Sequence, residues 1–329
     1  MSNESRPTQF FVRFRNAGVL AVLLVLVVGA AILTPQHTFI GAANLKLLSS
    51  QAPEFGIVAL GVGVLMVAGE FDLSVGAVLT FCSFVFAWLL ALPVNPFVAA
   101  GITLACGAAI GMINGLITVK AKVVSFIATL GAMLSYRGLV QILSGGKMRT
   151  VALDQEPVFV QLLTGRLGGI VPVQVLWFIL FAVILFFVLN RGRLGNWIYA
   201  TGDNAMAARA MAVDTDLVKI VCFVIVGSLV AFASVLQTVR VTTFNTHMAT
   251  GWELQAVAAA VVGGTSLLGG RGSMVGVFLG AVIIMVIDNM IGQARLASEW
   301  TYMAFGLVLL AAALLDLAIE KRIQRAAVA

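Results

Sequence analysis

The chain has 329 residues, of which 61% are hydrophobic and only 10% are charged, and its formal net charge is +6. Soluble domains carry about 25% charged residues, so this composition excludes water as the main solvent and indicates a membrane protein. The basic residues stand in small groups at the ends of apolar segments, which excludes a nucleic-acid-binding surface and is typical of topology signals. Cys82, Cys106 and Cys222 stand singly in apolar segments, so neither a disulfide framework nor a metal site is expected.

The first apolar segment, residues 17–33, follows Arg13 and Arg15 and has no clear A-x-A cleavage site at its end. It therefore predicts an uncleaved first membrane helix. The later apolar segments are separated by proline and glycine, and several approach the roughly 20 residues that cross a bilayer as a helix. Together they predict an all-α, polytopic membrane protein of about ten helices, at residues 17–34, 55–69, 73–92, 97–119, 122–143, 172–190, 217–239, 253–267, 273–291 and 298–317.

The distribution of lysine and arginine predicts the orientation, because both favour the cytoplasmic side of a bilayer. With the N-terminus inside, thirteen of these residues fall in inner segments and six in outer ones, while Arg137 lies within a helix. This excess places both tails, residues 1–16 and residues 319–329 with their KRIQR cluster, in the cytoplasm. Residues 17–318 are then expected to form a single transmembrane domain.

The stretch GEFDLSVG, residues 69–76, lies between the second and third predicted helices. Gly69 can end one helix in the left-handed conformation, and Asp72 can cap the next by accepting N–H bonds around Ser74 and Val75. The stretch therefore predicts a cytoplasmic helix break or gate. Whether Glu70 does more than remain in water is left open. The residues assigned to this break are Gly69, Asp72, Ser74 and Gly76.

Few ionisable residues lie within the predicted helices. Arg137 and Asp288 are the clearest ionisable ones, and we expect them to pair with each other. Asn114, Thr129 and Gln237 are candidates to line a translocation path, with interhelical hydrogen bonding as an equally favoured alternative.

The inner loop at residues 191–216 contains the stretch GDNAMAAR. Asp or Asn can cap a helix and AMAARAMA is a run of strong helix formers, so a short helix is predicted at residues 202–212. Two interpretations stay open. The helix is either a surface connector or a docking element, in which small alanines enter a groove on a partner and Arg209 provides a directional charge. The candidate contact residues are Gly202, Asp203, Asn204, Ala207, Ala208 and Arg209.

Residues 253–273 are rich in glycine, alanine and serine. Small residues let membrane helices approach closely, and a Gly-Gly pair permits irregular backbone beside a cavity. A second helix break is therefore expected at Gly263, Gly264, Thr265 and Ser266. The glycines that follow do not form an ATP-binding loop, because Arg271 and Gly272 stand where that motif requires Lys and Ser or Thr.

Taken together, five stretches resemble the permease subunits of bacterial monosaccharide ABC importers of the ribose, xylose and arabinose type, within the branched-chain amino acid and sugar permease superfamily. They occur in the family's order between residues 69 and 273: GEFDLSVG, GMINGLI, FIATLGAMLSYRGL, the GN…YATGDNAMAAR loop, and EL.AVAAAVVGGTSLLGG.GS. The chain departs from the family's pattern at three places, with Glu70 in place of the second glycine, Ser125 in place of a proline, and Ala212-Val213 in place of Gly-Ile.

The resemblance implies a multi-pass bacterial inner-membrane protein with a fold similar to the vitamin B12 importer class. It implies a second permease subunit, a cytoplasmic ABC ATPase that binds ATP and Mg²⁺, and a periplasmic sugar-binding protein. It further implies that this chain holds no catalytic residue, cofactor or metal of its own, and that the segment around Gly202 and Arg209 is the coupling helix that contacts the ATPase.

Alternative substrates for an ABC permease of this superfamily are nucleosides and branched-chain amino acids. An alternative of a different class is an ion-coupled secondary carrier, which the scarcity of carboxylates at membrane depth disfavours.

Overall fold

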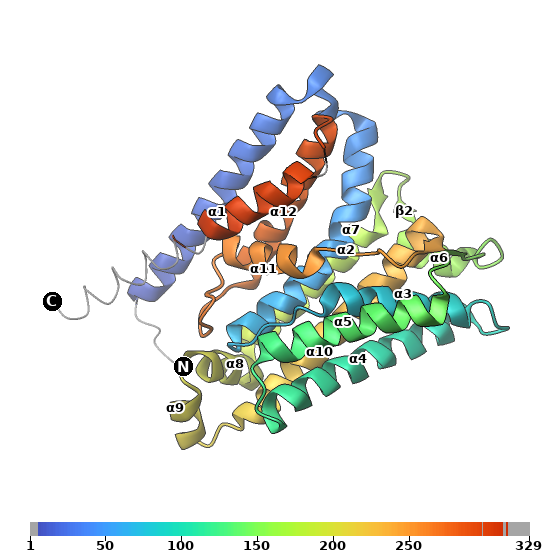
Figure 1. The fold of residues 1–329 in the computed structure, drawn as a ribbon. Helices are drawn as coiled ribbons and strands as arrows, with labels where there is room; N and C mark the ends of the chain where they lie inside the picture. Colours follow the sequence, from blue (N-terminus) through green and yellow to red (C-terminus); the bar gives the residue numbers. More distant parts are fainter. Residues whose placement is uncertain (1–5, 298, 312–313, 315–329) are drawn as a thin grey trace.

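The computed structural model describes residues 6–297, 299–311 and 314, with side chains described from residue 17 onwards. The described chain is a bundle of helices with two small strand pairs (Figure 1). Its first half consists of α1 (Arg6–Leu33), η1 (Pro35–Ile40), α2 (Ala42–Val67), α3 (Val75–Leu89), α4 (Pro96–Lys120) and α5 (Ser125–Ser144).

Four two-residue strands form two antiparallel pairs, one between strands far apart in sequence and one a short hairpin. Strand β1 (Arg149–Thr150) pairs antiparallel with β4 (Thr243–Phe244), and β2 (Arg166–Leu167) pairs antiparallel with β3 (Val171–Pro172). The second half contains α6 (Pro157–Thr164), α7 (Val173–Arg191), α8 (Arg193–Asp203), α9 (Ala205–Ala210), α10 (Thr215–Val241), α11 (Trp252–Val262) and α12 (Met274–Gln293). An apolar helix at Glu299–Ala311 ends the described region.

In the described residues, six helices are long and apolar enough to cross a membrane: α2, α4, α5, α7, α10 and α12. Four shorter apolar helices accompany them, at Ala17–Leu33, Val75–Leu89, Trp252–Val262 and Glu299–Ala311. Each of the ten predicted helices matches one of these, which confirms the prediction of a polytopic all-α membrane protein. The end of the last predicted helix and the tail at residues 319–329 lie outside the described residues.

The start of the second helix was predicted wrongly. Proline as a boundary places that start at residue 55, after Pro53, but α2 begins at Ala42 and continues through Pro53. Contacts with other helices stabilise the polar N-terminal part of α2. Asn44 exchanges side-chain hydrogen bonds of 2.8 Å with Asn289 on α12, and Glu54 is paired with Arg240 on α10. A helix that finds such partners tolerates residues whose local preference is against it.

Helix α10 lies at the centre of the bundle and packs along α4, α2 and α3. Its contact with α4 depends on small residues, since Gly107 and Gly111 approach the backbone of Gly227 and Phe223 so closely that a Cβ on either glycine would overlap a carbonyl oxygen. Glycines four residues apart let membrane helices meet through their backbones. Helices α8 and α9 lie together at one end of the bundle, beside the α4–α5 connection, whereas α6 and β2 lie at the opposite end (Figure 1).

Candidate functional site

The predicted break at residues 69–76 is a sharp reversal between α2 and α3. Gly69 has a φ of 82°, and its N–H donates to the carbonyl oxygen of Met66 at 2.9 Å, while the N–H of Glu70 donates to that of Leu65 at 3.2 Å. This pair of bonds is the Schellman arrangement that ends a helix at a left-handed glycine. Asp72 then accepts from the N–H of Ser74 at 2.8 Å and from its hydroxyl at 2.5 Å. Ser74 is itself the N-cap residue of α3 and no side chain caps that helix, so the predicted cap by Asp72 is wrong and its bonds form a turn before α3.

Side chains from two other helices complete this reversal. The N–H of Leu73 donates to the hydroxyl of Thr129 at 3.0 Å, and the amide of Asn114 donates to the hydroxyl of Ser74 at 2.9 Å. Ser125, which stands where the family often has proline, accepts from the N–H of Phe71 at 3.2 Å. Asn114 and Thr129 therefore make the interhelical hydrogen bonds that were one of their two expected roles. Their role as path-lining residues stays a prediction.

Glu70 does more than remain in water, which answers the question left open by the sequence. Its carboxylate lies 2.5 Å from the ammonium group of Lys219 near the start of α10, and the two side chains are only 11% and 22% exposed. This ion pair joins the first break to the central helix. The partner could not be found from sequence because the two residues are 149 positions apart.

The second predicted break uses the same backbone geometry as the first. Gly264 has a φ of 82°, and its N–H donates to Val261 at 2.8 Å, while the N–H of Thr265 donates to Ala260 at 2.8 Å. Helix α11 therefore ends at Val262, with Gly263 as its C-cap, five residues before the predicted end. The chain then continues without a helix through Ser266 until Ser273 caps α12.

The predicted coupling helix is two helices. Gly202 and Asp203 are the last residues of α8, and only the six-residue α9 follows. The expectation of one helix at residues 202–212 is therefore wrong. Asn204 has extended backbone angles, which stop α8, and its side chain accepts from the N–H of Ala207 at 3.0 Å, which starts α9.

The side chains of α9 differ in exposure. Ala207 shares in the Asn204 cap through its N–H, whereas Ala208 is only 5% exposed because it packs against its own chain. Arg209 is engaged within the chain, where it pairs with Asp216 at 2.5 Å and donates to Thr215 at 2.6 Å. The most exposed apolar side chains of this segment are Met206 and Met211, at 82% and 80%, and the sequence analysis had not singled them out.

Gly69, Gly202, Gly269 and Gly270 form one contact, which we call the glycine junction. The N–H of Gly270 donates to the carbonyl oxygen of Val67 at 2.9 Å. A Cβ on Gly202 would overlap that same oxygen, and a Cβ on Gly269 would lie 2.7 Å from the Cα of Gly69. The end of α8 therefore lies directly against the end of α2 and against the loop that follows the second break, and no side chain separates the three backbones.

The expected pair between Arg137 and Asp288 is wrong. Arg137 on α5 lies 3.9 Å from Glu253 on α11 and donates to the hydroxyl of Thr250 at 3.1 Å. A Cβ on Gly76, the last residue of the GEFDLSVG stretch, would meet the carboxylate of Glu253. Small size at residue 76 thus makes room for this charged contact between α3, α5 and α11.

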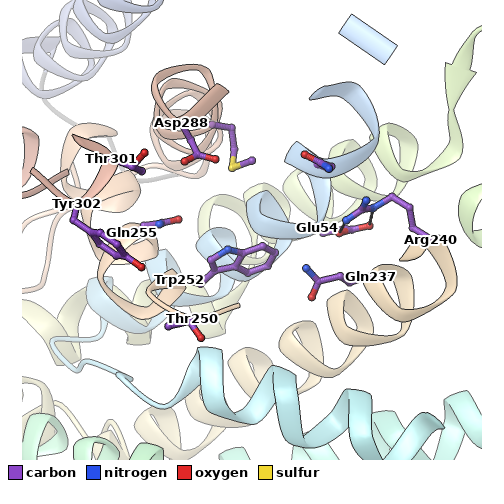
Figure 2. A pocket seen from close by; sticks show the side chains of 11 residues that line it. Glu54, Gln237, Arg240, Thr250, Trp252, Gln255, Asp288, Thr301 and Tyr302 are labelled. Atoms are coloured by element: carbon purple, nitrogen blue, oxygen red, sulfur yellow. Dashed lines mark hydrogen bonds and ion pairs between the residues drawn. The ribbon is translucent and has the colours of Figure 1, made fainter. Parts of the chain in front are cut away.

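Asp288 instead lines a cavity of about 360 Å³ between α2, α10, α11, α12 and the helix at Glu299–Ala311. Figure 2 shows Asp288 on one side of the cavity, the Glu54–Arg240 pair on another, and the ring of Trp252 between them. Gln237, the third residue predicted to line a path, is one of the lining residues. Glu54, Arg240, Trp252 and Tyr302 also line the cavity, and the sequence analysis missed all four.

The ion pair between Glu70 and Lys219 should stabilise the fold measurably. We expect the effects of Glu70→Gln and Lys219→Gln on the free energy of unfolding to be non-additive by about 1–3 kcal/mol in a double-mutant cycle. Each single change leaves the other charged side chain without its partner and poorly hydrated. The measurement is the free energy of unfolding in detergent. As a control, the exposed pair of Lys120 and Asp216, 4.0 Å apart, should show a coupling of about 1 kcal/mol or less. Additive effects at Glu70 and Lys219 would contradict the assignment.

Comparison with known proteins agrees with the resemblance inferred from sequence. Residues 44–313 match the family model described as branched-chain amino acid transport system / permease component. The chain is 34% identical over 299 residues to the ribose import permease protein of Escherichia coli strain K12, which covers 90% of this chain and 92% of that protein. It is 34% identical over 316 residues to the ribose import permease protein of Bacillus subtilis strain 168, and the match covers 96% of this chain and 97% of that protein.

A relative named for a different substrate comes from an archaeon. The chain is 36% identical over 259 residues to the xylose/arabinose import permease protein of Sulfolobus acidocaldarius, covering 76% of this chain and 71% of that protein. Residues 44–313, which match the family model, contain both helix breaks, the α8–α9 segment and the cavity. The chain therefore belongs to the family of branched-chain amino acid transport system permease components.

Proposed function

We propose that this chain is the membrane-spanning permease subunit of an ABC importer and that it translocates a monosaccharide or a related polyol. The observation that carries the proposal is the likeness, over nine-tenths or more of both chains, to two proteins named as ribose import permeases. The archaeal relative named for xylose and arabinose extends the substrate class to other pentoses.

The glycine junction supports a mechanism for coupling. Separate ATPase subunits bind ATP and Mg²⁺, dock at the α8–α9 segment, and displace α8 when they close or open. Because Gly202 contacts the backbone of Val67 and Gly270 without an intervening side chain, a displacement of α8 is transmitted to the end of α2 and to the loop that joins the second break to α12. The protein then alternates between outward-open and inward-open states, and partner chains bias the equilibrium.

The assembly follows from the same proposal. Two permease subunits, identical or different, form the translocation path in the bacterial inner membrane, and a periplasmic binding protein delivers the sugar. Both termini lie in the cytoplasm, as the excess of lysine and arginine in inner segments indicates. In that orientation α8 and α9 lie at the cytoplasmic end of the bundle, where an ATPase can reach them.

An ion-coupled carrier is the competing class. Such carriers use carboxylates that are free to bind and release a proton or cation at membrane depth. Here Glu54, Glu70 and Glu253 each face an arginine or lysine. Asp72 at the first break and Asp288 in the cavity are the buried or cavity-lining carboxylates on which an ion-coupled mechanism would have to depend.

Reconstitution tests the proposed function. The chain, its ATPase and its binding protein are placed in proteoliposomes, and uptake of labelled D-ribose, D-xylose and L-arabinose is measured with and without internal ATP. We expect uptake of at least one pentose that depends on ATP and on the binding protein. Uptake by the permease alone, driven by a proton or sodium gradient, would overturn the ABC assignment, and transport of isoleucine with no sugar transport would overturn the substrate class.

The junction predicts an uncoupled variant. Gly202→Ala places a methyl group against the backbone of Val67, and overpacking of this kind costs about 1–3 kcal/mol. We expect the complex to assemble and hydrolyse ATP while uptake falls by about tenfold or more. Gly138→Ala is the control, because an added Cβ there meets open space. Wild-type uptake by Gly202→Ala would show that the junction does not transmit movement.

The exposed methionines predict the docking contact. Met206→Asp combined with Met211→Asp replaces adaptable apolar side chains with charge, and we expect the ATPase to be lost on co-purification from membranes. Met148→Asp is the matched control, because Met148 is 73% exposed but lies next to β1, at the other end of the bundle. Retention of the ATPase by the double variant, with the control unaffected, would place the contact elsewhere.

A further inference from the structure

The cavity between α2, α10, α11, α12 and Glu299–Ala311 is open on one side, where Thr250, Asp288 and Tyr302 are exposed, and its lining differs from the core of the bundle. Core positions of these helices are mostly aliphatic and fully buried, as at Leu60, Leu236 and Ile284. The cavity is instead lined mainly by amide, hydroxyl, aromatic and charged side chains. Polar groups inside a membrane protein are costly and usually mark a path or a ligand. The volume of about 360 Å³ lies within the range of sites for small molecules, roughly 300–1,000 Å³.

Two aromatic rings provide flat apolar surfaces in the cavity. Trp252 opens α11 and is held by an edge-to-face contact with Phe55, with ring centroids 5.5 Å apart. Tyr302 lies across the space beside Gln255 and Thr301 (Figure 2). One face of a sugar ring consists of C–H groups, and an aromatic ring in a pocket with a few placed polar groups suits such a face.

The hydrogen-bonding groups of the cavity have spare capacity. The amide oxygen of Gln237 is buried, and among the described residues it has no hydrogen-bond partner. A buried amide left unpaired costs about 1–3 kcal/mol, so a ligand that pairs with it gains this energy. Gln255 and Thr250 add further donors and acceptors on the same lining. Sugar hydroxyls both donate and accept, which matches amides and hydroxyls that do the same.

The charges of the cavity argue against an anionic ligand. Arg240 is the one cation among the described lining residues, and its Nε and Nη2 groups donate to the two carboxylate oxygens of Glu54 at 2.6 and 2.9 Å. The pair is neutral, and Asp288 adds a further carboxylate. A carboxylate or phosphate would meet no unpaired cation there, so an amino acid or a phosphorylated sugar fits poorly and a neutral polyhydroxylated ligand fits well.

We propose that this cavity is a monosaccharide-binding subsite within a single permease subunit. The sugar lies against the ring of Trp252 and bonds to Gln237, with Gln255 and Thr250 on the surrounding wall. The inference rests on the proposed function and adds a subsite separate from that of the periplasmic binding protein. Helix α11 carries Trp252 at its start and ends at the second break, and the loop after that break contains Gly269 and Gly270, so α11 and this loop connect the subsite to the glycine junction.

The test measures binding to the permease–ATPase complex in nanodiscs, without the binding protein. The probe is labelled D-ribose, or the pentose that the complete importer takes up if ribose is not transported. The wild-type complex should bind the sugar saturably, and Gln237→Leu should weaken binding by about tenfold through loss of hydrogen bonds to a buried amide. Trp252→Leu should weaken it similarly, whereas Trp252→Phe should retain most of the affinity because it keeps an aromatic face.

Gln174→Leu is the matched control. The amide oxygen of Gln174 is also buried without a partner among the described residues, but Gln174 lies at the start of α7, outside the cavity. This variant should bind the sugar as the wild type does. Excess isoleucine should not displace the sugar from the wild-type complex.

A second measurement does not depend on the folding of the Gln237 and Trp252 variants. Thr250→Cys places a thiol in the cavity wall, and the bound sugar should slow its reaction with a hydrophilic thiosulfonate severalfold, whereas Thr150→Cys on β1, outside the membrane spans and the cavity, should react at the same rate with and without sugar. The subsite is refuted if the complete importer transports a pentose while the wild-type complex binds none of it, or if Gln237→Leu binds it unchanged. Failure of the complete importer to transport any sugar would instead refute the proposed function.

Discussion

The structure depends on one constraint: hydrocarbon offers no hydrogen bonds, so backbone that leaves a helix within the membrane domain must find partners in the protein. Both breaks meet it in the same way. Gly69 and Gly264 turn the chain in the left-handed conformation, and the carbonyl groups at the ends of α2 and α11 accept bonds from the residues that follow. At the first break, Ser125 and Thr129 accept from the freed N–H groups of Phe71 and Leu73. Polar residues are therefore found in apolar helices where they face irregular backbone.

The same constraint explains why glycine is concentrated where α8 meets the breaks. The bond from the N–H of Gly270 to Val67 can form only if the two backbones approach closely, and a side chain on Gly202 would prevent it. A contact made of backbone alone has no flexible side chain to absorb a displacement. The same backbone contact therefore supplies hydrogen-bond partners and can transmit a movement of α8. Helix α11 runs from the second break to Trp252 in the wall of the polar cavity.

Charged residues in the membrane domain link helices that are distant in sequence. Glu54 and Arg240 join α2 to α10, Glu70 and Lys219 join the first break to α10, and Arg137 and Glu253 join α5 to α11. Each of these ion pairs engages a carboxylate that would otherwise be free to bind an ion. The wrong expectation of a pair between Arg137 and Asp288 shows why: residues near the same predicted depth were matched by type, but helix rotation and packing decide which side chains face each other.

Four features can be predicted from the amino-acid sequence: the number of apolar helices, the membrane class, the family, and the breaks at Gly69 and Gly264. These depend on composition, hydrophobic length and local turn chemistry, which are readable along the chain. Packing sets three others, namely that α2 continues through Pro53, that Asn204 divides the inner segment into α8 and α9, and that Glu70 pairs with Lys219. It alone placed Gln237 beside Trp252 and the Glu54–Arg240 pair in one cavity. The reason is physical: such contacts join residues far apart in sequence, and their partners are chosen by how the helices pack and rotate against one another.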